Sequence, residues 1–173
     1  MHPLNKNKFN FFLYKYFPII LLFIGVLNET DLNYLGIKYF SFNFSYILIF
    51  YYSVKRSQSL GYISIFIAGL FNDVVMGTPI GLSSLMYLII CVAASYLRNI
   101  TLRPSLIKDA IFFLITILII NALLFLTLNF MFNYELKYLD QIINITWTFV
   151  LYFLLSNLFD FFENYFLGNN NVR

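Results

Sequence analysis

Reactive and charged residues are scarce in this 173-residue chain. It has one cysteine, Cys91, and one histidine, His2, and charged residues make up only 11% of it. A single cysteine excludes an intramolecular disulfide and a thiolate metal cluster, and a histidine at the terminus leaves no catalytic Ser/His/Asp or Cys/His set. The sequence also lacks a phosphate-binding glycine loop and any spaced group of metal-ligating side chains. These absences predict a protein that is not an enzyme and carries no cofactor or metal.

Apolar residues dominate the chain instead. They make up 61% of it, and the mean hydropathy is +0.78. A soluble domain carries about 25% charged residues, and one of this length could not hide so much apolar surface from water. The composition therefore predicts an all-α polytopic membrane protein, with residues 1–173 forming a single integral membrane domain in the lipid bilayer. The formal net charge of +3 does not indicate a nucleic-acid partner.

Apolar runs and their breaks predict six transmembrane helices arranged as a bundle. Lysines precede the first run, as in a signal peptide, but no small-x-small cleavage site follows it, so we expect a retained helix. The second and third runs are shorter than the roughly 20 residues that a crossing needs, and it stays open whether they span fully. The six segments are 11–27, 40–54, 60–76, 80–97, 106–132 and 139–167.

A tight connection is predicted between the third and fourth segments, at residues 76–79. Gly77 suits the left-handed position that ends a helix. Thr78 is expected to cap the next helix, with Pro79 at its first position. Small residues in both segments, including Gly69, favour close helix approach. We therefore expect an antiparallel hairpin here.

Basic residues are distributed unevenly across the predicted topology. With six crossings, nine of the eleven Lys and Arg fall on the side that holds both termini, and only Lys38 and Lys137 fall on the other. By the positive-inside rule, the first side is cytoplasmic.

Asp73, near the outer end of the third segment, is the strongest single candidate for a functional residue. Polar groups inside a bilayer are costly, so the carboxylate could make a conformational or assembly contact. Alternatively, Asp73 lies close enough to the interface to be hydrated, or caps the turn toward Thr78.

Polar residues at helical spacing mark the last two segments. We expect hydrogen bonds between helices, and the alternative is a water-lined path. The residues are Asn121, Thr127, Asn129, Gln141, Asn144, Thr148, Asn157 and Asn164.

Asp160 and Glu163 lie one turn apart at the cytoplasmic end of the last segment. They would meet a basic partner or the chain's own Arg98 or Arg103. The alternative is a solvated helix end.

The middle of the chain predicts a glycine-containing helix, then an aspartate, and then a Gly-x-Pro-x-Gly turn that opens a leucine-rich helix. These positions are Gly69, Asp73, Gly77, Pro79 and Gly81. The pattern resembles that of the MreD family of bacterial rod shape-determining membrane proteins. The close resemblance covers about 35 residues, and the rest of the chain agrees in length and number of spans.

This resemblance implies a location, partners and a role. Members of the family lie in the inner membrane with MreC, in a cell-elongation complex that includes the MreB filament, the RodA glycosyltransferase and a class B penicillin-binding transpeptidase. They organise side-wall peptidoglycan synthesis without any known catalysis.

The fold of this family is similar to that of the S-components of energy-coupling-factor transporters. The alternative function is therefore a vitamin-binding S-component, although such proteins dock through small residues on the first segment and this segment has only one glycine and no alanine. A channel is disfavoured because the sequence places no charged residue at the bilayer centre.

Overall fold

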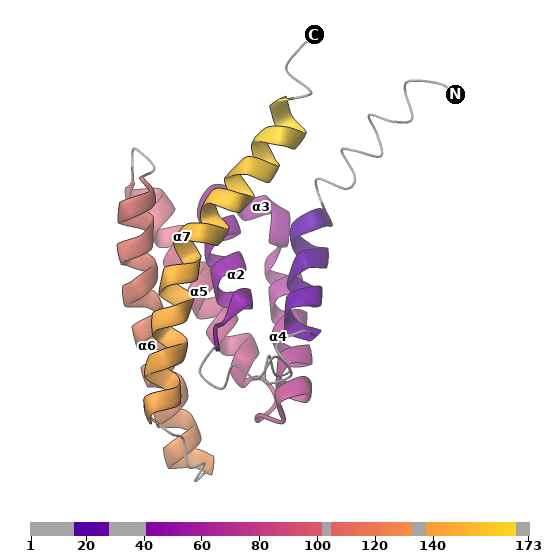
Figure 1. Cartoon of the computed structure of the whole chain (residues 1–173). Helices are drawn as coiled ribbons and strands as arrows, with labels where there is room; N and C mark the ends of the chain where they lie inside the picture. Colours follow the sequence, from indigo (N-terminus) through magenta and orange to yellow (C-terminus); the bar gives the residue numbers. More distant parts are fainter. Residues whose placement is uncertain (1–15, 28–40, 102–104, 133–137, 169–173) are drawn as a thin grey trace, which may run out of the picture.

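The structure, a computed structural model, describes residues 16–27, 41–101, 105–132 and 138–168, and every element within these ranges is a helix (Figure 1). No strand occurs in this part of the chain. The helices are Tyr16–Leu27, α2 (Phe44–Lys55), α3 (Ser57–Leu60), α4 (Tyr62–Met76), α5 (Leu82–Ile100), α6 (Leu106–Phe132) and α7 (Tyr138–Gly168). The predicted all-α membrane fold is confirmed.

Three of the described helices are long and apolar enough to cross a membrane: α5, α6, and α7 as far as Asn164. The others are shorter. The 12 residues of α2 rise only about 18 Å, against the roughly 30 Å of a hydrocarbon core. The short α3 continues the chain between α2 and α4. The second and third predicted segments are thus short as helices, as their apolar runs indicate.

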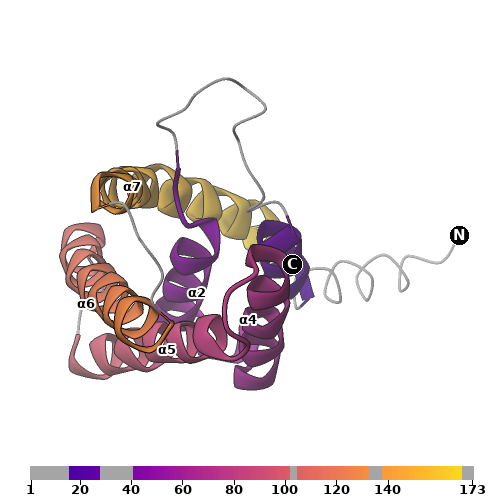
Figure 2. The same ribbon diagram turned by 90° about the horizontal axis from the view of Figure 1, so that it is seen from below.

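The short helix α2 forms the centre of the bundle. Its nine residues from Ser45 to Ser53 are all buried. In a view along the bundle, the Tyr16–Leu27 helix, α4, α5, α6 and α7 stand around it (Figure 2). A helix that is apolar on every face needs such an enclosure.

Aromatic rings fill the space between α2, α6 and α7. The Phe50 ring lies 5.0 Å from that of Phe113 and 5.9 Å from that of Tyr152, measured between centroids. Phe113 and Tyr152 stack at 4.5 Å. Such pairs contribute about 0.5–1.5 kcal/mol each beyond simple burial. In lipid, where apolar side chains gain little by leaving the solvent, this packing is a main source of cohesion.

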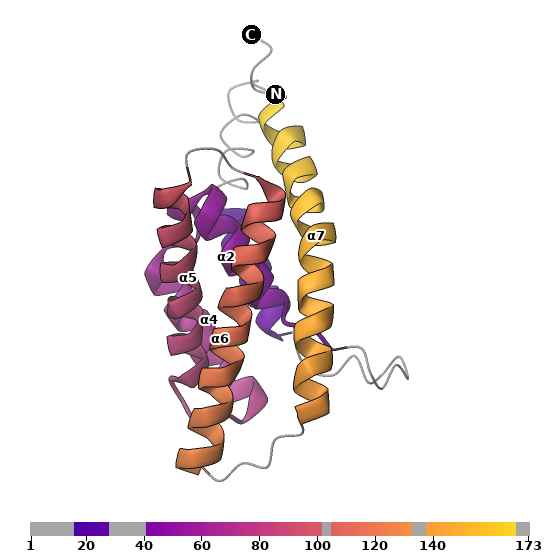
Figure 3. The ribbon, with the colours of Figure 1, turned by 90° about the vertical axis from the view of Figure 1, so that its left-hand side faces the viewer.

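Apart from the short α3, the described helices run alternately in opposite directions, so their ends gather at two ends of the bundle (Figures 1 and 3). The α2–α3 junction, the end of α5, the start of α6 and the end of α7 share one end. All four described basic residues, Lys55, Arg56, Arg98 and Lys108, belong to these segments. We call this the basic end. The α4–α5 turn lies at the opposite end.

Candidate functional site

The α4–α5 hairpin contains all five residues that carry the family pattern. Its two helices touch through their backbones at Gly69. A Cβ atom added there would lie 2.5 Å from the Ser84 backbone nitrogen. The Ser84 hydroxyl donates to the Phe66 carbonyl at 2.9 Å, which binds the same two helices. The predicted close approach of small residues is present at this point.

The Asp73 carboxylate fastens the turn between these helices. It accepts three hydrogen bonds: from the Thr78 hydroxyl at 2.9 Å, from the Gly81 N–H at 2.7 Å and from the Ser83 N–H at 2.9 Å. Asp73 is only 1% exposed. A buried carboxylate is tolerated when donors of this kind satisfy its oxygens. Of the two non-functional alternatives, hydration does not fit this burial, whereas capping of the turn describes the geometry.

Two glycines shape the turn in the left-handed region. Gly77 has φ 67° and ends α4, as predicted, and Gly81 has φ 98°. The expected capping by Thr78 with Pro79 at the first helical position is wrong. Helix α5 begins at Leu82 after Gly81, and the Leu82 N–H donates to the Pro79 carbonyl at 3.1 Å. The Thr78 hydroxyl is turned back to Asp73, so it is not available to cap α5.

A second polar cluster lies at the basic end, between α2 and α7. The Tyr51 hydroxyl donates to Asp160 Oδ1 at 2.7 Å, and Lys55 Nζ lies 3.1 Å from the same oxygen. Arg56 Nη1 lies 3.5 Å from Glu163 Oε1. The two acids therefore hold α7 against the end of α2.

Among the described residues, Asp160 and Glu163 do not pair with Arg98, although this pairing was one of the expected contacts. Arg98 donates to the Ser53 carbonyl at 3.2 Å instead. Arg103 lies outside the described residues. The partners were missed because contacts between residues about one hundred positions apart depend on how α7 docks on α2.

Asp109 is a buried acid that the sequence analysis overlooked. It lies in the first turn of α6 and is 2% exposed. A carboxylate in the first turn of a helix is favoured by the helix dipole. The available signal was an acidic residue just inside the start of a long apolar run.

The polar residues of the last two helices divide into two groups. Asn144 and Thr148 bind the segment before α2: Asn43 Nδ2 donates to Asn144 Oδ1 at 3.0 Å, and the Asn43 N–H donates to Thr148 Oγ1 at 3.0 Å. The predicted interhelical bonding is thus present there. Asn121 and Thr127 instead donate to carbonyls of their own helix.

The polar contacts of both clusters lie between helices or close the turn between two of them. Carboxylates, hydroxyls and amides are used to join helices. Cys91 is buried and accepts from the Ser53 hydroxyl at 3.4 Å, in keeping with a packing role. Within the described ranges, no group of three or more His, Cys, Asp or Glu side chains could hold a metal ion.

Comparison with known proteins gives one family. A family model described as rod shape-determining protein MreD matches residues 8–162. The match includes the whole α4–α5 hairpin and extends along α7 past Asp160. No curated protein and no solved structure matches the chain.

Proposed function

The chain belongs to the MreD family of rod shape-determining proteins, and from this membership we propose that it is a non-catalytic scaffold of the bacterial cell-elongation complex. Its role would be to organise side-wall peptidoglycan synthesis together with MreC. The family and the membrane helices indicate a multi-pass protein of the inner membrane that takes part in determining rod shape.

The observation that carries the scaffold proposal is the set of hydrogen bonds that the Asp73 carboxylate accepts. In a transporter or channel, a buried carboxylate usually serves an ion or substrate. Here, three donors from the chain's own turn satisfy it. With the Gly69–Ser84 backbone contact, these bonds make the hairpin a stiff unit. A stiff unit suits a protein that positions partners.

The hairpin also offers a surface for such a partner. Ile63, Ile67 and Val74 lie at spacings of four and seven along α4, and they are 76%, 39% and 69% exposed. Residues at this spacing share one face of a helix. We propose that this face packs against a transmembrane helix of MreC, since helices associate in lipid through packing and hydrogen bonds. MreB, RodA and the class B transpeptidase would join through the same complex.

The proposed orientation places the basic end, and with it both termini, in the cytoplasm. All four described basic residues belong to segments at that end, as the positive-inside rule requires of a cytoplasmic side. The acids Asp73 and Asp140 would then lie toward the outer face.

Depletion and complementation test this proposal directly. Loss of the protein should turn rods into spheres, and the wild-type gene should restore both rod shape and co-purification with MreC. A triple substitution of Ile63, Ile67 and Val74 by alanine should restore neither, whereas a triple alanine substitution of Leu118, Leu123 and Leu126 on α6 is the matched control. If depleted cells stay rods, the scaffold proposal fails.

The transporter alternative has a separate test. An S-component would co-purify with a stoichiometric vitamin-like ligand and would dock through small residues on its first helix. The one glycine of that helix, Gly25, is buried, and a Cβ there would lie 2.6 Å from the Phe44 ring. A tightly bound vitamin in the purified protein would nevertheless decide for the transporter.

A further inference from the structure

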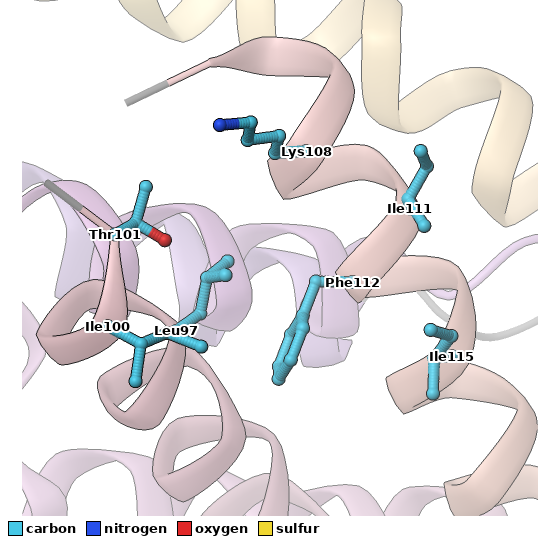
Figure 4. Close-up of a pocket in the computed structure, with 7 residues that line it drawn as sticks. All are labelled: Leu97, Ile100, Thr101, Lys108, Ile111, Phe112 and Ile115. Carbon is cyan, nitrogen blue, oxygen red and sulfur yellow. The ribbon is translucent and has the colours of Figure 1, made fainter. Parts of the chain in front are cut away.

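A groove of about 610 Å³ lies between the end of α5 and the start of α6, at the basic end (Figure 4). Apolar side chains form most of its lining, including Leu97 and Ile100 from α5 and Ile111 and Ile115 from α6. Its polar lining residues are Thr101 and Lys108. The groove is not part of either cluster described above.

The polarity of the lining changes with depth in the membrane. Lys108, Ile111 and Ile115 lie at spacings of three and four, so they share a face of α6, and Ile115 lies about 10 Å farther along the helix than Lys108. Thr101 follows the last residue of α5 and lies at the same end as Lys108. The polar groups thus stand at the water boundary and the isoleucines reach toward the hydrocarbon.

The groove opens toward lipid rather than toward the bundle interior. Ile100, Ile111 and Ile115 are 55%, 53% and 50% exposed. Figure 4 shows Lys108 extending over the end of α5 and Phe112 pointing into the space between the helices. A molecule could therefore enter sideways from the bilayer.

Lys108 differs from the other described basic residues in its contacts. Lys55 and Arg56 have carboxylate partners, and Arg98 donates to the Ser53 carbonyl. The Lys108 side chain has no hydrogen bond or ion pair with any described residue. Among the described residues, nothing pairs with this ammonium group at the mouth of the apolar groove.

We propose that this groove binds one anionic phospholipid of the inner leaflet. Lys108 Nζ and the Thr101 hydroxyl donate to the lipid phosphate, and an acyl chain lies along Ile111 and Ile115. Basic pockets between transmembrane helices on the cytoplasmic side favour anionic head groups. The groove has a charged group at its mouth and apolar side chains deeper in the membrane. A phospholipid has the same order, with a charged head group followed by acyl chains.

The test is native mass spectrometry of the full-length protein in detergent, titrated with phosphatidylglycerol and separately with phosphatidylcholine. One phosphatidylglycerol should bind about fivefold more tightly than phosphatidylcholine, the factor that corresponds to about 1 kcal/mol for one Lys near an anionic surface. K108Q should remove this preference and K108R should keep it. R98Q, which has the same net charge as K108Q, is the matched control.

A second pair of variants tests the apolar part of the site. I111W fills the groove and should weaken both lipids, whereas I142W, at an exposed position near the start of α7, should weaken neither. Equal affinity for the two lipids, or equal losses in K108Q and R98Q, would overturn the proposal. So would an I111W protein that loses a protein partner while binding lipid normally, because the groove would then seat a partner helix.

Discussion

Gly69 of α4 lies against the backbone of Ser84 in α5, so closely that a Cβ at Gly69 would stand 2.5 Å from the Ser84 nitrogen. Gly69→Ala must push the two backbones apart, and overpacking of this kind costs about 1–3 kcal/mol. We expect a lower melting temperature in detergent. Gly25→Ala is the comparison, since the atoms nearest to its Cβ would belong to the Phe44 side chain and not to a backbone. Equal melting temperatures for the two variants would contradict backbone contact at Gly69.

Asp73→Asn tests the carboxylate that closes the turn. Both Asp73 oxygens accept hydrogen bonds, two of them from backbone N–H groups. An asparagine amide has one oxygen and one NH₂ group, so the NH₂ group would face a donor. We expect a loss of about 1–3 kcal/mol in the free energy of unfolding, measured by denaturation in mixed micelles, and loss of rod shape in complemented cells.

Asp140→Asn is the matched control for this change. Asp140 is an exposed acid at the same end of the bundle, so its substitution should leave stability and cell shape unchanged. Full stability of Asp73→Asn would show that the turn does not depend on the carboxylate.

Substitutions at Gly77 distinguish the effect of backbone strain from that of steric crowding. Its φ is 67°, and an added Cβ would meet nothing within 4 Å. Gly77→Val should therefore suffer only from the left-handed conformation, by about 1–2 kcal/mol, whereas Gly77→Asn should be milder because asparagine tolerates that region. Rod-shape complementation should follow the order Gly, Asn, Val. An Asn variant as defective as the Val variant would exclude conformational strain as the cause.

How far the sequence predicts this hairpin depends on the range of the contacts. The left-handed Gly77 follows from local sequence, because a glycine after an apolar run is a common helix end. The start of α5 does not. Asp73 draws back the Thr78 hydroxyl and the Gly81 N–H, so the chain makes another turn before Leu82. The start of α5 thus depends on a side chain nine positions before it.

The same distinction applies to the long helices. The segment 106–132 coincides with α6, Leu106–Phe132, because its apolar run is unbroken. The partners of Asp160 and the burial of Asp109 could not be predicted, since both depend on the rotation of α6 and α7 about their axes. A helix with apolar residues on every side gives no preferred inward face.

The Tyr51–Asp160 contact should couple α2 to α7. The hydroxyl donates to Oδ1 at 2.7 Å, and a hydrogen bond to a charged group contributes about 1.5–3 kcal/mol. A double-mutant cycle with Tyr51→Phe and Asp160→Asn should give a coupling energy of about 1 kcal/mol. The value is expected at this lower level because Asp160 also pairs with Lys55, and a partly exposed ion pair contributes little to stability. Additive losses in the free energy of unfolding would mean that this hydrogen bond does not couple α2 to α7.

The orientation of the bundle can be measured with single cysteines. In a Cys91→Ala background, Thr101→Cys places a thiol at the basic end, and Ile80→Cys places one in the exposed α4–α5 turn. If the positive-inside rule governs this chain, a membrane-impermeant maleimide should label residue 80 in spheroplasts and residue 101 only after the inner membrane is opened. Labelling of residue 101 in intact spheroplasts would reverse the topology. It would also move Lys108 and the proposed lipid groove to the outer leaflet, so the one measurement bears on both the scaffold and the lipid site.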